Sequence, residues 1–206
     1  MSPQALTECY RQVRGVTEEL CTPLEVEDFV VQSMPDASPV RWHLAHSTWF
    51  FETFVLEAAD PEYIPFESSY RFLFNSYYNT LGEQYPRPQR GLLTRPGLAT
   101  VRNYRDSVDQ ALAGRLASGR LPEALLDIVE LGLNHEEQHQ ELLLTDVLHL
   151  LSLNPLRPAY REDLGEPGHE SVTPFSWHRG ADGIQSIGHR GAGFGFDNEG
   201  PRHKLL

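Results

Sequence analysis

Apolar side chains recur at helical spacing in four long segments, and this pattern limits the chain to a mainly α-helical fold. The segments are residues 3–20, 40–59, 97–116 and 122–153. In each segment apolar residues stand three and four positions apart, which places them on one face of a helix. Four such faces can bury one another in a bundle, so the sequence predicts an antiparallel four-helix bundle over residues 1–154.

Local signals predict where some elements begin. Ser38 followed by Pro39 is typical of a helix start, with Ser38 as the capping residue and Pro39 at the first helical position. The shorter segment Leu24–Met34 is predicted to be helical as well. Residues 61–96 are irregular, and a connection of that length inside a bundle usually has a function.

After residue 154 the composition shifts to glycine and proline. Residues 155–171 are predicted to form a linker and residues 172–206 to be β-rich. Strands or turns are predicted at Val172–Trp177, Gly193–Phe196 and Lys204–Leu206. Roughly fifty residues are too few for an independent β-rich domain. We therefore expect a second domain that begins here and continues beyond Leu206.

Charge and composition exclude several classes of partner. Seventeen Lys and Arg residues against 29 Asp and Glu give a net charge of −12, which disfavours binding to nucleic acid or to an anionic membrane. The sequence contains neither an apolar stretch long enough to span a bilayer nor an apolar N-terminal signal region. Cys9 and Cys21 are predicted to be reduced thiols. A cytoplasmic location is expected.

One segment has the opposite charge from the rest of the chain. Residues 71–105 contain six arginines and a single acid, Glu83, so the segment carries a charge of +5. This excess indicates a local anion site, because a guanidinium group binds carboxylates in a bidentate manner. The alternative is that these arginines are solvated or ion-paired on the surface.

The most informative motif lies in the last of the four helical segments. His135 and His139 are four residues apart, so both imidazoles lie on one helix face, which is otherwise apolar. Buried imidazoles need partners, and a divalent metal ion satisfies both at once. The alternative is that one histidine bonds to a carbonyl group and the other lies at the bundle edge.

A metal held by two histidines needs a third ligand, and the aromatic segment 40–59 offers His43 and His46. Trp42, His46 and Trp49 share one narrow stripe, so His46 is expected to face the core. His43 is displaced towards the flank of the helix. We therefore predict His46 as the third ligand and assign His43 to packing or to support of a ligand.

The same residues also match the zinc-protease pattern His-Glu-x-x-His, in which the glutamate is the general base. A zinc protease of this type would require Glu136 for catalysis and would not require His46. The pattern fixes few positions, so chance matches are frequent. Glu136 is not on the face of the two histidines, and we expect it to be solvated.

Several strings together resemble the sulfoxide synthases of ergothioneine biosynthesis. These enzymes have a DinB-like bundle followed by a formylglycine-generating-enzyme-like domain of the C-type-lectin-like type. The strings that carry the resemblance are Trp42–Glu52, Phe72–Asn79, Pro86–Leu93, Asn134–Asp146 and Gly195–His203. They cover nearly the whole chain, in the order found in the family.

The resemblance implies a function and a set of site residues. Family members bind one Fe(II) ion through three histidines, which correspond to His46, His135 and His139. Using O2, they join hercynine (Nα-trimethylhistidine) to γ-glutamylcysteine or cysteine, and the product is a sulfoxide. The thiol substrate is held at positions that correspond to Arg87, Pro88, Gln89 and Arg90. Gln138 corresponds to a residue beside the hercynine site.

The resemblance also implies that this chain lacks part of the active site. In the family a catalytic tyrosine belongs to the second domain, which lies beyond Leu206 here. We expect this domain to be supplied in cis or by another chain, and the present chain to bind metal but to be inactive or nearly so alone. The alternatives are a DinB-like thiol S-transferase that uses Zn or Ni, and a metal-stabilised bundle without catalytic activity.

Overall fold

All four predicted long helices are present in the computed structural model, which describes residues 3–76, 82–163, 174–191 and 193–206. The helices are α1 (Pro3–Cys21), α2 (Val40–Phe51), α5 (Leu98–Ala117) and α6 (Leu126–Leu153). A short 3₁₀ helix, Glu123–Leu125, leads into α6. The chain divides into two units, Met1–Glu162 and Asp163–Leu206. The predicted linker 155–171 stays a prediction, since residues 164–173 lie outside the described part.

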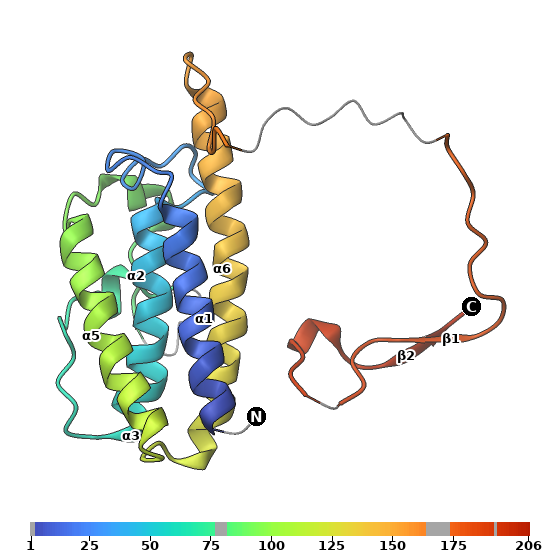
Figure 1. Cartoon of the computed structure of the whole chain (residues 1–206), viewed down its shortest axis with the longest axis horizontal. Coiled ribbons are helices and arrows are strands. Elements are labelled where there is room, and N and C mark those ends of the chain that lie inside the picture. The colour runs from blue at the N-terminus through green and yellow to red at the C-terminus, as the bar shows by residue number, and fades with distance from the viewer. Residues whose placement is uncertain (1–2, 77–81, 164–173, 192) are drawn as a thin grey trace. The chain divides into compact units, whose positions relative to one another are not determined.

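The packing of the helices differs from the expected antiparallel order. Helices α1 and α2 each pack against both α5 and α6. Figure 1 shows α1 and α6 running one way along the bundle and α2 and α5 running the other way. The prediction is therefore wrong for α1 with α6 and for α2 with α5. The reason is the long connection between α2 and α5, which returns the chain along the bundle before α5 begins.

Helix α2 is the most deeply buried element of the bundle. Every residue from Val40 to Phe51 is buried, so this helix has no solvent face. It continues through a π-helical turn, Glu52–Leu56, into the short helix α3 (Glu57–Ala59). A helix without a solvent face must be covered by other parts of the chain on all sides. The connection to α5, which contains α4 (Tyr70–Leu73) and the 3₁₀ helix Arg87–Leu92, contributes to this cover.

Two predictions near the start of α2 are wrong. Leu24–Met34 forms turns and bends instead of a helix, because the segment is short and its three β-branched valines disfavour helix formation. Ser38 does not cap α2: the cap residue is Pro39, with no side-chain cap bond. The backbone N–H of Ser38 instead donates to Asp146 Oδ2 (2.8 Å), so the start of α2 is tied to α6.

Residues 174–191 and 193–206 of the second unit contain a two-stranded sheet. Strands β1 (Gln185–Ile187) and β2 (His203–Leu205) pair antiparallel, with Ser186 opposite Lys204. The strand predicted near Lys204 is thus confirmed, whereas 174–177 and 193–196 contain no strand. Residues 172–173 lie outside the described part. Phe175 and Trp177 are 84% and 90% exposed, so these aromatic side chains gain no burial that would favour a strand there.

A buried ion network joins three helices of the bundle. Glu136 on α6 is fully buried and accepts hydrogen bonds from Arg14 on α1 (2.9 Å) and Arg105 on α5 (2.6 Å). Thr17 donates a third bond, at 2.7 Å. Burial alone would raise the pKa of Glu136, but the charges of Arg105 and Arg14 outweigh it and lower the pKa to about 2. The expectation that Glu136 is solvated is therefore wrong.

Other features of the described residues agree with the composition. Cys9 and Cys21 are free thiols, as predicted. Burial raises the pKa of the Cys21 thiol to about 12, which makes it a poor nucleophile. Among the residues that the structure describes, every helix is too short or too polar to cross a membrane.

Replacing Glu136 tests whether the ion network stabilises the bundle. Glu136→Gln removes the buried carboxylate that Arg14 and Arg105 share and leaves them only Asp109 and Glu18 as charged partners, so we expect the free energy of unfolding to fall by about 3 kcal/mol. Urea denaturation of the metal-free protein measures this loss. The matched control is Glu137→Gln, because Glu137 is exposed; it should change stability by about 0.5 kcal/mol or less. Equal stability of the two variants would contradict the assigned role.

Candidate metal centre

Three histidines from two helices converge in the bundle. His46 comes from α2, His135 and His139 come from α6, and each offers a nitrogen within 4.8 Å of the other two. The Nε2 atoms of His46 and His135 are 3.2 Å apart. Two imidazole nitrogens bound to one ion at about 2.1 Å, with an angle of 90–110° between them, are about 3.0–3.4 Å apart. The observed spacing therefore fits a shared metal ion.

A glycine allows α6 to approach α2 closely at this level. Gly132 precedes His135 by three residues, and a Cβ atom at this position would lie 2.5 Å from Cε1 of Phe51 and 2.9 Å from Cε1 of Phe50. Distances this short are not tolerated between carbon atoms. The ring of His135 packs against Phe50, with ring centroids 4.9 Å apart. The absent side chain at 132 thus helps to set how far His135 reaches towards α2.

Contacts on both faces of the ring and at Nδ1 fix the orientation of His46. Its ring stacks on Trp42 (centroids 4.4 Å apart) and on Trp49 (5.5 Å), as the predicted stripe implies. Its Nδ1 lies 2.6 Å from the carbonyl oxygen of Phe74, which can only accept, so Nδ1 carries the proton. The lone pair of the neutral ring is therefore on Nε2, the atom that faces His135.

Nδ1 of His139 contacts His43, whereas Nδ1 of His46 contacts a carbonyl group. His139 Nδ1 is 2.9 Å from His43 Nδ1, and His43 Nε2 is 3.1 Å from Asp146 Oδ2. His43 therefore lies beside the three-histidine group and touches one of its members, in agreement with the supporting role predicted for it. Nδ1 of His135 is buried and has no hydrogen-bond partner within the described ranges.

All three histidines are held in the neutral state that binds metals. Burial lowers the pKa of His135 to about 4. Burial also lowers the pKa values of His46 and His139 well below their ordinary value, and the neighbouring imidazoles add to this effect. Neutral imidazole is the form that ligates Zn and Fe. The donor set, its spacing and its protonation state thus fit a divalent transition metal.

The arrangement argues against the protease reading. Both oxygens of Glu136 are engaged by arginines and a threonine of α1 and α5, away from bulk water. A general base must be within reach of the water that it deprotonates, and its pKa should lie near the working pH. A fully buried carboxylate with a pKa of about 2 meets neither condition.

The predicted substrate residue Arg90 lies next to the histidine group but is deeply buried. Its guanidinium carbon is 3.4 Å from the centre of the Trp42 ring, whose other face covers His46. Its nitrogens donate to the hydroxyls of Ser38 (2.9 Å) and Ser76 (3.1 Å). Arg90 thus links the chain segment between α2 and α5 to Trp42 and, through Trp42, to His46.

The other predicted substrate residues are more accessible. Arg87 is partly buried, and its charge, like that of Arg90, contributes to lowering the pKa of His43, after burial as the main cause. Pro88 and Gln89 are exposed on the 3₁₀ helix, and Gln138 is exposed on α6 between the two histidines. Tyr77, Tyr78 and Asn79 of the sequence motif lie outside the described residues.

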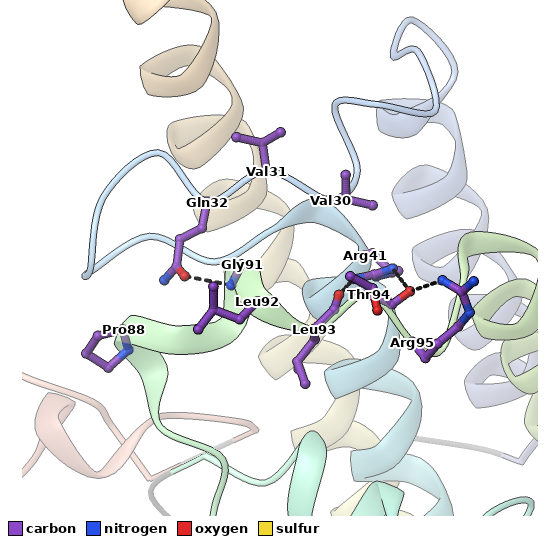
Figure 2. A pocket seen from close by; sticks show the side chains of 10 residues that line it. All are labelled: Val30, Val31, Gln32, Arg41, Pro88, Gly91, Leu92, Leu93, Thr94 and Arg95. Atoms are coloured by element: carbon purple, nitrogen blue, oxygen red, sulfur yellow. Dashed lines mark hydrogen bonds between the residues drawn. The ribbon is translucent and has the colours of Figure 1, made fainter.

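A cavity of about 640 Å³ lies beside the 3₁₀ helix, between it and the segment 30–32 (Figure 2). Arg41 of α2 and Arg95 both line it. Arg41 donates to the carbonyls of Leu93 and Thr94. Burial, followed by the charge of Arg95, lowers the pKa of Arg41. Sequence reasoning did not single out Arg41, because it lies in the aromatic segment 40–59 and outside the arginine-rich segment 71–105.

Comparison with known proteins assigns most of the bundle to a family. The model of the DinB superfamily matches residues 10–143, which run from α1 into α6 and include all three histidines. No curated protein matches the chain.

The neutral histidines predict a pH dependence of the metal-free protein. Below about pH 6.5 the unfolded chain binds protons more readily than the buried ring of His46 and the partly buried rings of His135 and His139, so the free energy of unfolding falls as the pH drops towards 4. For His135, with a folded pKa of about 4, this loss is at most about 3 kcal/mol. Urea denaturation in EDTA between about pH 7.5 and 4.5 measures it.

His135→Gln should make this pH dependence less steep, with His46 and His139 accounting for the remainder, whereas His178→Gln should leave it unchanged, because His178 is exposed in the second unit. Glu136 contributes little in this window, since its stabilisation is lost only as the pH falls from about 4.5 towards 2. A slope that is identical in the wild type and His135→Gln would show that His135 is not buried in the neutral form.

Proposed function

Because this chain belongs to the DinB superfamily, we propose that it is the metal-binding part of a non-haem, O2-dependent sulfoxide synthase. The proposed reaction joins hercynine to γ-glutamylcysteine or cysteine, and the proposed metal is Fe(II). The observation that carries the proposal is the convergence of His46, His135 and His139 next to a buried arginine. The arginine-rich connection and the resemblance of the chain to such synthases, described above, supply the choice of substrates.

The donor set suits thiol chemistry. Three neutral imidazoles leave the full charge of a divalent ion in place, unlike a site with a carboxylate ligand. That charge favours binding of a thiolate, whose pKa falls on coordination. Fe(II), when bound, would supply O2 activation and open positions for the two organic substrates. The role of the protein is to hold the three rings neutral and to shield them from water.

Arginines would position the thiol substrate. Both γ-glutamylcysteine and cysteine carry carboxylates, and guanidinium groups pair with these in a bidentate manner. Arg87 is the better candidate for direct contact, because it is only partly buried, whereas Arg90 is 3% exposed. Arg90 would act through its positive charge and through its contact with the Trp42 ring, which stacks on His46. Gln138, exposed between His135 and His139, is proposed to lie on the hercynine side.

We further propose that a formylglycine-generating-enzyme-like domain completes the site and supplies a catalytic tyrosine. On this proposal residues 172–206 are the beginning of that domain, and the present chain alone binds metal and thiol without efficient turnover. The location is proposed to be cytoplasmic, in keeping with two free thiols.

A second candidate is a DinB-like thiol S-transferase that uses Zn or Ni. It is favoured by one observation, the family match, which covers only the bundle. The two candidates share the three-histidine site and the use of a thiol. They differ in their second substrate, because only the synthase binds hercynine.

Thiol binding to the metal-loaded protein tests the proposal. We expect one Fe(II) or Co(II) per chain under anaerobic conditions, and an intense near-ultraviolet thiolate-to-Co(II) band on addition of γ-glutamylcysteine or cysteine. His46→Ala should abolish both. Arg87→Met should weaken thiol binding by about 10- to 100-fold, because it removes a charged hydrogen-bond donor.

Two controls make the result interpretable. His149→Ala removes a histidine that contacts Ser33, outside the three-histidine group, and should retain metal and thiol. Arg102→Met removes an exposed arginine near Glu18 and should bind thiol as the wild type does. A response of the Co(II) spectrum to hercynine supports the synthase; thiol binding with no response to hercynine supports the transferase. Absence of metal binding contradicts both.

A further inference from the structure

The metal ligand His139 is backed by two side chains that neither the motif nor the family match assigns. We propose that His43 and Asp146 are positioning residues that fix the tautomer and ring orientation of His139 and thereby set the affinity of the metal site. The inference rests on the proposed metal centre and deepens it. It is carried by the contacts His139 Nδ1–His43 Nδ1 (2.9 Å) and His43 Nε2–Asp146 Oδ2 (3.1 Å).

The direction of the hydrogen bonds follows from Asp146. A carboxylate only accepts hydrogen bonds, so Nε2 of His43 donates to it. In a neutral ring the lone pair of His43 is then on Nδ1, which accepts from Nδ1–H of His139. The lone pair of His139 is therefore on Nε2, which leaves that atom available to a metal ion. The order of donors thus selects the tautomer of His139 that can act as a ligand.

The positions of the two residues in the fold explain why the pair is rigid. His43 is buried and precedes His46 by three residues on α2, so it shares the packing that holds the other ligand. Asp146 follows His139 by seven residues, two turns along the same face of α6. The side chains of His43 and Asp146 are 4% and 12% exposed, so water competes little for their contact.

Asp146 also connects this pair to the arginine at the site. The oxygen that accepts from His43 accepts the backbone N–H of Ser38 as well (2.8 Å). The hydroxyl of Ser38 in turn accepts from Arg90 (2.9 Å). A movement of Arg90 on substrate binding would therefore act on the same carboxylate that orients His139.

Supporting carboxylates of this kind usually change metal affinity by about 10- to 100-fold when they are removed. We expect Asp146→Asn and His43→Gln each to weaken Co(II) binding by such a factor, measured by competition with a chelator, and to shift the ligand-field spectrum of bound Co(II). Saturating metal should still give one ion per chain. The double variant should bind no more weakly than His43→Gln alone, because the two residues act in series.

The variants separate positioning from folding. Asp146→Asn keeps an oxygen that can accept from Ser38, and His43→Gln leaves the contact between Asp146 and Ser38 untouched. Stability in EDTA reports any loss of folding, and the Co(II) spectrum reports the ligand geometry, which a purely structural role would not alter. The matched control is Glu141→Gln, an equal charge change at an exposed position of α6.

The outcomes distinguish this inference from the proposed function. Wild-type affinity and spectrum in both single variants, or additive losses in the double variant, overturn the positioning role while the metal centre stands. A wild-type protein that binds no metal, or binds it as His46→Ala does, overturns both. Weakened, non-additive binding with a shifted spectrum supports the proposal.

Discussion

The ion pairs of Glu136 with Arg14 and Arg105 determine how α6 is rotated about its own axis, and the convergence of the three histidines depends on that rotation. Neighbouring residues of a helix point about 100° apart. With the carboxylate of Glu136 held between α1 and α5, the ring of His135 is directed towards α2. A different rotation would bury an unpaired charge, whose cost is several kcal/mol. The charged network thus stabilises an uncharged cluster of imidazoles next to it.

The second constraint is the course of the chain between α2 and α5. Because these neighbouring helices run in the same direction, the connection must return along the bundle (Figure 1). On its way it supplies the carbonyl of Phe74 to His46 and the guanidinium of Arg90 to Trp42. The connection therefore both covers α2 and completes the site. In a four-helix bundle with short loops, Nδ1 of His46 would lack the carbonyl oxygen of Phe74 as an acceptor.

The sequence predicts the long helices of this structure well, and its short segments and distant contacts poorly. Helix bounds and the choice of His46 over His43 follow from periodicity, which depends only on neighbouring residues. The burial of Glu136 does not follow from periodicity, because its partner Arg14 is 122 positions away and charged residues are usually exposed. The role of Asp146 could not be predicted for the same reason: its partners His43, on α2, and Ser38, just before α2, are more than 100 positions away. The strand β1 has a weak local pattern of three exposed residues.

The position of Arg90 reconciles two requirements of a site that binds both a metal and an anionic substrate. Imidazoles must stay unprotonated to bind a metal, and an anion requires a positive charge nearby. Burial and the neighbouring imidazoles lower the pKa values of His46 and His139, and the charge of Arg90 acts in the same direction on both. A guanidinium group stays charged throughout the physiological pH range. One buried cation thus adds to the effect of burial in keeping the rings in their metal-binding form and, on the proposed function, would attract a carboxylate or a thiolate, whereas a buried carboxylate in its place would favour protonated, non-ligating histidines.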